Sequence, residues 1–140
     1  MPLKRFSFLL CLVLLIPLLS GCGDTVKASL DSQFTLSPGQ SVNIAGESMD
    51  IKFIGITQDS RCPTGVECIQ AGNVSCNIDI TQNGSRNHIL LTETGGPGAS
   101  QGYMSQKYML VFNISPYPEA GKTISKSDYR LSMTVSKLGQ

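Results

Sequence analysis

The sequence Val74-Ser75-Cys76-Asn77-Ile78-Asp79-Ile80-Thr81-Gln82-Asn83-Gly84 decides the fold class of this chain. Apolar residues alternate with polar ones from Val74 to Thr81, which is the pattern of a β-strand with one face in a core and the other in water. Asn83-Gly84 follows the strand, and this pair favours a two-residue type I′ hairpin because both central residues of that turn need a positive φ. We therefore expect the chain to fold back and continue as a second strand through His88 to Thr92.

Upstream of this hairpin, the same short alternating pattern recurs. Phe34 and Leu36 begin one strand, and a longer run from Met49 to Thr57 predicts another. Ile54 and Ile56 lie on the opposite face of that run from its other apolar residues, so we expect its far end to be covered on both sides.

Downstream, apolar residues again alternate with polar ones, in two further runs: Tyr108, Leu110, Phe112 and Ile114, and then Leu131, Met133 and Val135. No stretch beyond residue 21 shows the i, i+3, i+4, i+7 spacing of an amphipathic helix. About seven short strands separated by turn residues predict an all-β domain, an antiparallel β-sandwich that is Ig-like or a partly open barrel.

The N-terminal segment predicts export. Lys4 and Arg5 precede a nearly unbroken apolar run from Phe6 to Leu19, and the small residues Ser20 and Gly21 follow it. This order is typical of a secretory signal peptide. An uncleaved membrane span fits less well, because a span needs about 20 apolar residues and is usually followed by a cluster of Lys or Arg.

The sequence Leu19-Ser20-Gly21-Cys22 resembles the lipobox of bacterial lipoproteins. The resemblance implies cleavage before Cys22, acylation of this cysteine, and anchorage of the mature chain to a membrane of the bacterial cell envelope. The chain would then consist of a signal peptide at 1–21, a lipidated tether at 22–31 and a β-sandwich domain at 32–140.

Charge gives no reason to expect a nucleic acid as a partner. Loss of Lys4 and Arg5 with the signal reduces the 11 basic residues to 9, against 10 acidic ones. A nearly neutral surface provides no general attraction to nucleic acid or to anionic lipid. The mature length suits one domain and is too short for two.

Three cysteines, Cys62, Cys68 and Cys76, remain in the mature domain, where an oxidising setting makes a disulfide the default expectation. Cys76 follows the alternation of Val74 and Ile78, so we predict a buried free thiol. Cys62 and Cys68 are therefore the favoured pair. A zinc site that uses these thiols and His88 lacks the usual C-x-x-C spacing, and we predict neither a metal nor a cofactor.

Asp59-Ser60-Arg61-Cys62-Pro63, followed by Cys68 and by Ala71-Gly72, resembles the signature of a family of small bacterial envelope lipoproteins and secreted proteins of uncharacterised function. A looser similarity continues through Pro116-Tyr117-Pro118 and the closing strand with Tyr129. Members of that family often carry tryptophan where this chain has Gln70. The resemblance implies the fold and the disulfide, and it supplies no activity.

Four residues are candidates for recognition: Arg61, Glu67, Gln70 and Tyr117. In one interpretation, Arg61 and Glu67 contact a partner from a rigid loop. In the alternative, which we favour, Asp59 and Arg61 brace the loop against its own strands.

The sequence contains no H-E-x-x-H helix, phosphate loop or dinucleotide fingerprint, and we do not expect an enzyme. We expect a module that binds an envelope protein, peptide or glycan through the disulfide loop 59–72 and the Gly-rich loop 94–102. One alternative is a structural subunit of an envelope complex that uses a strand edge. The other is an inhibitor of cysteine proteases, because Cys62-Pro63-Thr64-Gly65 and Gly95-Gly96-Pro97-Gly98 are similar to wedge loops of the chagasin family.

Overall fold

The structure is a computed structural model that describes residues 24–139, so the predicted signal peptide and Cys22 lie outside the described residues. The described part contains nine strands: β1 (Thr25–Ala28), β2 (Gln33–Leu36), β3 (Ser41–Ile44), β4 (Met49–Asp59), β5 (Asn73–Gln82), β6 (Ser85–Thr94), β7 (Gln101–Met104), β8 (Tyr108–Ser115) and β9 (Arg130–Lys137). Its one helical element is a short 3-10 turn, η1 (Lys126–Asp128). None of the helices within residues 24–139 is long and apolar enough to cross a membrane.

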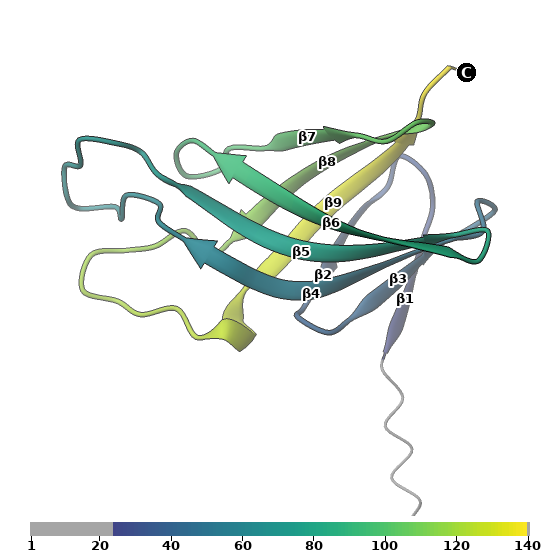
Figure 1. Cartoon of the computed structure of the whole chain (residues 1–140). Helices are drawn as coiled ribbons and strands as arrows, with labels where there is room; N and C mark the ends of the chain where they lie inside the picture. Colours follow the sequence, from purple (N-terminus) through teal and green to yellow (C-terminus); the bar gives the residue numbers. More distant parts are fainter. Residues whose placement is uncertain (1–23, 140) are drawn as a thin grey trace, which may run out of the picture.

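The strands form two sheets that pack face to face (Figure 1). The five-stranded sheet has the order β1-β3-β4-β5-β6, and the four-stranded sheet has the order β2-β9-β8-β7. The predicted β-sandwich is therefore confirmed, and the two sheets do not join into a closed barrel. The part of the chain that the structure describes has nine strands where about seven are expected, and the two additional ones, β1 and β7, contain no fully buried residue.

β1 corrects the prediction of a tether that runs to residue 31. Thr25–Ala28 pairs with β3 in parallel, in a domain whose other strand pairs are antiparallel within the described residues. Val26 and Ala28 pack against the core from this strand. With only these two apolar residues, the segment has too short an alternation to be recognised, and its pairing depends on β3, which follows it in the chain.

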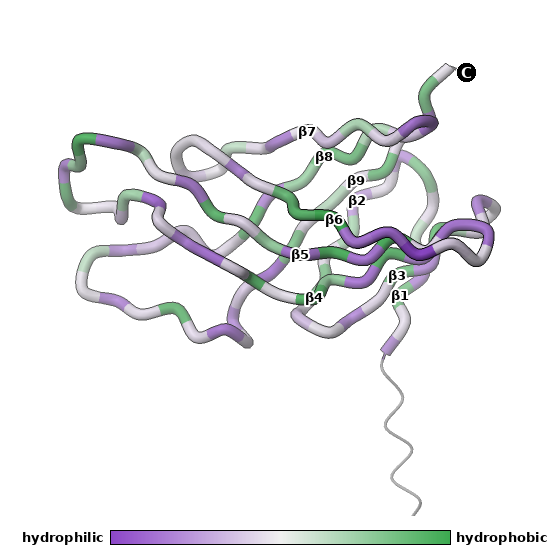
Figure 2. The backbone as a smooth tube through the Cα atoms, viewed as in Figure 1, coloured by the Kyte–Doolittle hydropathy of each residue, from purple (hydrophilic) through white to green (hydrophobic). Residues whose placement is uncertain are grey.

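The core lies between the sheets and consists of the inward residues of the strands. Figure 2 shows hydrophobic and hydrophilic residues alternating along the strands. The predicted core residues Val74, Cys76, Ile78 and Ile80 are all buried. Full burial of one large aliphatic side chain contributes about 1.5–3 kcal/mol. The largest fully buried side chains are Phe53, Leu36, Ile44, Met49, Ile51, Ile78, Leu91, Leu110, Ile114, Leu131, Met133 and Glu93.

The two residues at the far end of β4 differ from expectation. Ile54 is exposed, whereas Ile56 is half-buried and packs against the core, so within residues 24–139 no second layer covers Ile54. The register between β4 and β5 shifts after Phe53 and again after Ile56. These irregularities, rather than burial on both faces, account for the broken alternation of the sequence.

The β5–β6 hairpin is as predicted. Asn83 has a φ of 49° and Gly84 a φ of 81°, both positive as a type I′ turn requires. The pairing is regular from Gln82 opposite Ser85 to Asn73 opposite Thr94. The connections at 59–72, 94–102 and 115–129 meet at the other end of the sandwich, at the left in Figure 1, and we call this the loop end.

Candidate binding site at the loop end

The predicted disulfide between Cys62 and Cys68 is present, with the two Cα atoms 5.9 Å apart. The ring that it closes and the residues just after it are exposed. Val66 and Ile69 are among the exposed large hydrophobic residues, and Ile69 is fully exposed. Glu67 and Gln70, both candidates for recognition, are exposed beside them. The disulfide loop therefore presents an apolar tip with one acid and one amide.

Arg61 lies beneath this tip and is only 4 % exposed. Its Nε and Nη2 donate to the Oδ1 and Oδ2 atoms of Asp59 at 2.9 and 2.6 Å. Its Nη1 donates to the carbonyl oxygen of Ile114 and its Nη2 to that of Pro116, each at 2.9 Å. The side chain thus braces the loop, as in the alternative that we favoured, and no longer qualifies as an accessible recognition residue.

Arg61 and Asp59 form an ion pair. Burial by itself would raise the pKa of the Asp59 carboxyl, but hydrogen bonds from Arg61 and its positive charge outweigh that effect and hold the pKa below its ordinary value. The hydroxyl of Tyr129 also donates to Oδ2 of Asp59, at 3.0 Å. Burial and this bond to the carboxylate raise the pKa of Tyr129 to about 12. Asp59 is therefore a fixed anion that holds two donors.

Tyr117 is the fourth candidate residue and is half-buried. Its ring lies over the guanidinium of Arg61, with 4.9 Å between Cζ and the ring centroid. This distance is within the range of a cation–π contact. Tyr117 therefore covers the brace and leaves part of its ring at the surface.

Backbone hydrogen bonds tie the disulfide loop to the segment that follows β8. The amide of Thr64 donates to the carbonyl of Pro118 at 2.9 Å, and the amide of Ala120 donates to the carbonyl of Thr64 at 3.0 Å. Together with Arg61, these bonds attach the loop to the four-stranded sheet as well as to its own strands. The tip is consequently held in place from two sides.

Gly72 lies where the two ends of the disulfide loop approach each other. It has a φ of +69°, and a Cβ atom there would lie 1.8 Å from the carbonyl oxygen of Ser60. Beside it, the amide of Cys62 donates to the carbonyl of Ala71 at 2.8 Å. The two ends of the loop approach so closely here that only glycine fits.

Glu93 is a further residue of the site, which the sequence analysis did not identify. It is 1 % exposed, and its Oε2 accepts from the amide of Ile114 at 2.5 Å. Burial raises the pKa of this carboxyl, although the bond from Ile114 and the charge of Arg61 oppose the rise. The available signal was its position, since Glu93 continues the inward alternation of Ile89 and Leu91 along β6.

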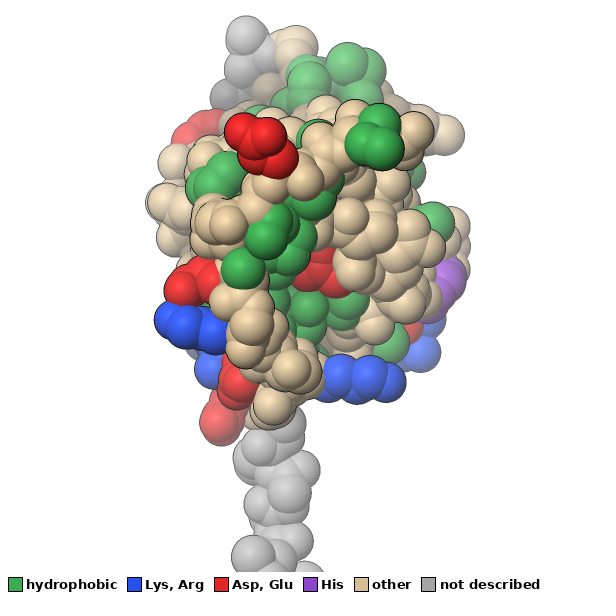
Figure 3. All heavy atoms as spheres, turned by 90° about the vertical axis from the view of Figure 1, so that its left-hand side faces the viewer, with side chains coloured by type: hydrophobic (Ala, Val, Ile, Leu, Met, Phe, Trp, Pro, Cys, Tyr) green, Lys and Arg blue, Asp and Glu red, His purple; other side chains and the backbone are tan. Residues whose placement is uncertain are grey.

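The Gly-rich loop is anchored at its two ends. The side-chain amide of Asn113 donates to the carbonyl of Ala99 at 2.6 Å, and Oε1 of Gln101 accepts from the hydroxyl of Thr94 at 3.2 Å. Between these points Gly96, Pro97 and Gly98 are exposed. Figure 3 looks onto this end and shows hydrophobic side chains through its middle, with charged ones mostly toward the margins.

His88 and Cys76 lie apart from the disulfide. Nδ1 of His88 is 2.7 Å from Oδ1 of Asp79 on the outer face of the five-stranded sheet. Cys76 is a buried free thiol whose pKa is raised to about 12, mainly by burial. Within residues 24–139, no group of three or more His, Cys, Asp or Glu side chains is arranged to hold a metal ion.

No protein-family model matches this chain, and neither a curated protein nor a solved structure matches it.

Proposed function

We propose that the mature protein is a lipid-anchored β-sandwich of a bacterial envelope and binds a protein, peptide or glycan partner through its loop end. The observation that carries the proposal is the exposed apolar tip, Val66 and Ile69, on a loop fixed by a disulfide, a buried arginine and backbone bonds to a second loop. Exposed apolar side chains on a rigid support are typical of interaction sites.

Rigidity favours binding because a preformed loop loses little conformational entropy when it meets a partner. Glu67 and Gln70 add a charge and a two-way hydrogen-bonding amide beside the apolar tip. The proposed site thus combines an apolar centre with a polar margin, which is the usual composition of a recognition surface.

Binding rather than catalysis is supported by the state of the titratable groups at this end. Asp59, Arg61 and Glu93 are each engaged by one another or by backbone groups of β8 and the segment after it. A general acid or base must reach a substrate, and these side chains are committed to holding the fold.

The proposed anchor would keep the domain close to the membrane. β1 begins at Thr25, so the chain from Cys22 to that strand spans at most about 10 Å. β1 lies on the opposite side of the sandwich from β6 and β7 (Figure 1). The edge formed by β6 and β7 would then face away from the lipid surface.

Fractionation tests the anchor. Cys22→Ser removes the thiol that carries the lipid, so the protein should leave the membrane fraction or accumulate as an uncleaved precursor, because each buried CH₂ contributes about 0.8 kcal/mol of the attachment. A Cys22→Ser protein that is processed normally and still sediments with membranes would contradict the lipoprotein assignment.

Copurification tests the site. The intact lipoprotein, used as bait in native membranes, should retain a stoichiometric partner that is lost with Ile69→Asp. Ile54→Asp is the matched control, because Ile54 is another exposed isoleucine but lies on the outer face of β4. A partner that survives both Ile69→Asp and Val66→Asp would contradict a binding site at the loop end.

A further inference from the structure

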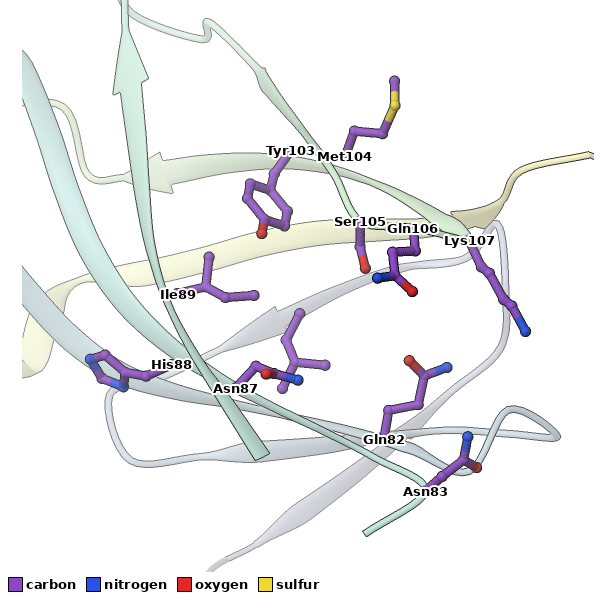
Figure 4. A pocket seen from close by; sticks show the side chains of 11 residues that line it. Gln82, Asn83, Asn87, His88, Ile89, Tyr103, Met104, Ser105, Gln106 and Lys107 are labelled. Carbon is purple, nitrogen blue, oxygen red and sulfur yellow. The ribbon is translucent and has the colours of Figure 1, made fainter. Parts of the chain in front are cut away.

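β6 and β7 are the outer strands of the two sheets on the same side of the sandwich. Toward the Asn83-Gly84 turn they do not close against each other, and an open pocket of about 620 Å³ lies between β6 and the turn that joins β7 to β8. In Figure 4, Ile89 and Tyr103 point into this space from opposite sides, and Met104 points away from it.

The hairpin register defines which backbone groups of β6 face this opening. Gln82 and Ser85 flank the two-residue turn and form a hydrogen-bonded pair. The N–H and C=O of Ser85 therefore face β5, and those of alternate residues beginning with Arg86 point away from β5. The outward residues toward the turn are Arg86, His88 and Leu90. Within residues 24–139, β5 is the only strand that pairs with β6.

Side-chain contacts support this register. Residues opposite each other in non-hydrogen-bonded pairs have closer side chains. His88 lies opposite Asp79 with 2.7 Å between Nδ1 and Oδ1, and Thr92 lies opposite Ser75 with 2.9 Å between their hydroxyl oxygens. The outward amide of Thr94 donates to Oε1 of Gln101, a residue of β7, at 3.4 Å. The outward backbone groups of β6 are therefore on the side of β7.

The two ends of the opening differ in whether side chains bind the outward backbone groups. Near the loop end, Gln101 caps the outward amide of Thr94, and Arg61 and Glu93 cap both backbone groups of Ile114. Toward the turn, β6 continues as a regular strand with no bulge and no proline. A long, regular and uncapped edge of this kind is a template for another strand.

The side chains around the opening suit an extended peptide. Ile80, Ile89 and Tyr103 provide apolar surface, and Asn87 and Gln106 provide amides. Lys107 is the only Lys, Arg, Asp or Glu residue among those that line the pocket. Two exposed hydrophobic residues flank the opening, Leu90 at 58 % and Met104 at 65 % exposure. An added strand would lie beside Leu90 and would satisfy the outward backbone groups of β6.

We propose that the free edge of β6 accepts an extended peptide segment of a partner protein as an added strand. One apolar side chain of the segment would enter the space between Ile89 and Tyr103, and an acidic one would meet Lys107. A second copy of this chain is less suitable, because its own edge would bring an identical Lys107. This surface is separate from the loop end, so the inference goes beyond the function proposed above and stands or falls independently of it.

The test uses the full-length protein in detergent and a displayed library of random nine-residue peptides. We expect the selected peptides to alternate in polarity, with a central apolar residue and a nearby acid. N-methylation of successive amides in a selected peptide should weaken binding at every second position only, because only alternate amides face β6. No enrichment from the library, or a response to methylation without this alternation, would overturn the proposal.

Two substitutions of His88 distinguish peptide binding by the β6 backbone from peptide binding by the histidine side chain. His88→Pro removes an outward N–H that is not used in pairing with β5, and proline is tolerated at such edge positions. We expect it to weaken peptide binding about tenfold or more. His88→Ala keeps the N–H and should bind as the wild type does.

If both variants lose peptide affinity equally, the peptide contacts the imidazole rather than the backbone N–H, and the proposal of strand addition is overturned. Circular dichroism of each variant checks that the sheet is intact, and the methylation pattern tests the proposal if His88→Pro does not fold. Concentration-dependent dimerisation that is abolished by His88→Pro would also overturn it, in favour of a second copy at the same edge.

Discussion

Arg61 and Glu93 hold the two backbone groups of a single residue, Ile114. The guanidinium of Arg61 donates to the carbonyl of Ile114 at 2.9 Å, and the carboxyl of Glu93 accepts from its amide at 2.5 Å. β7 pairs with β8 only as far as Phe112, so these two side chains continue the ladder where the neighbouring strand has ended. They also join the disulfide loop and the five-stranded sheet to the four-stranded sheet.

The first prediction concerns the buried acceptor of this arrangement. Glu93→Leu leaves the amide of Ile114 without its acceptor in a buried site, so we expect the free energy of unfolding to fall by about 1–3 kcal/mol. Glu93→Gln retains an acceptor oxygen and should cost less. Urea denaturation of both variants measures the difference, and equal stability of Glu93→Leu and the wild type would show that the bond contributes nothing.

The second prediction concerns acid. The pKa of Asp59 is lowered in the folded state from an ordinary value of 3.8, mainly because Arg61 outweighs the effect of burial. A lowered carboxyl pKa stabilises the fold above the unfolded pKa, and this stabilisation is lost as the pH falls through the folded pKa. Denaturation at a series of pH values should show the wild type losing stability below about pH 4.

Asp59→Asn should be less stable at neutral pH and should lose less stability between pH 5 and 2. Glu93 acts in the opposite direction, because its raised pKa makes the fold bind a proton more readily than the unfolded chain does. Glu93 therefore stabilises the fold most at low pH, and this stabilisation declines as the pH rises above the pKa of Glu93 in the unfolded chain. Glu93→Gln removes it, so the free energy of unfolding should fall more steeply with acid in this variant than in the wild type. An unchanged acid profile in Asp59→Asn would contradict the proposed role of the Asp59–Arg61 pair.

The parts of the fold that the sequence predicted are those determined by local chemistry. Alternation along β5, the positive φ values of Asn83-Gly84 and the pairing of Cys62 with Cys68 depend on neighbouring residues, and all three are present. The short strands β1 and β7 are not predicted because, unlike β2 and β3 of the same length, they contribute no fully buried residue to the core.

The interior of the candidate site was harder to predict than its surface. The exposure of Glu67 and Gln70 follows from their polar loop, whereas the burial of Arg61 depends on the carbonyl of Ile114, which is distant in sequence. Glu93 stands at an inward position of a strand, and its role becomes visible only when β8 is placed opposite it. Remote backbone partners leave no pattern in the sequence around a side chain.

The third prediction concerns the disulfide. Reduction of the Cys62–Cys68 bond should cost about 2 kcal/mol and loosen mainly residues 59–72, because a small ring constrains little beyond itself. Amide exchange should rise in the disulfide loop and remain low in β5 and β8. Loss of the far-ultraviolet β signal on reduction would show that the bond supports the whole sheet instead.

The fourth prediction concerns Cys76. Because the thiol is buried and its pKa is raised to about 12, a thiol reagent should label it only after denaturation. Cys76→Val should be tolerated, since it keeps an apolar group of similar size in the core. Mass spectrometry of the labelled protein checks the first expectation and thermal unfolding the second, and labelling of the native protein would contradict the burial of this strand face.

The last prediction tests why the disulfide loop needs glycine at its exit. An alanine Cβ at position 72 would lie 1.8 Å from the carbonyl oxygen of Ser60, and the φ of +69° adds backbone strain. We expect Gly72→Ala to destabilise the protein by about 2 kcal/mol or more, because the clash is with backbone that cannot move without opening the loop. Gly84→Ala is the matched control, since Gly84 has a φ of +81° but nothing within 4 Å of an added Cβ. Gly84→Ala introduces the backbone strain without the clash, so the difference between the two variants measures the clash. If urea denaturation finds both variants equally stable, the backbone at Ser60 moves freely to make room for the added Cβ.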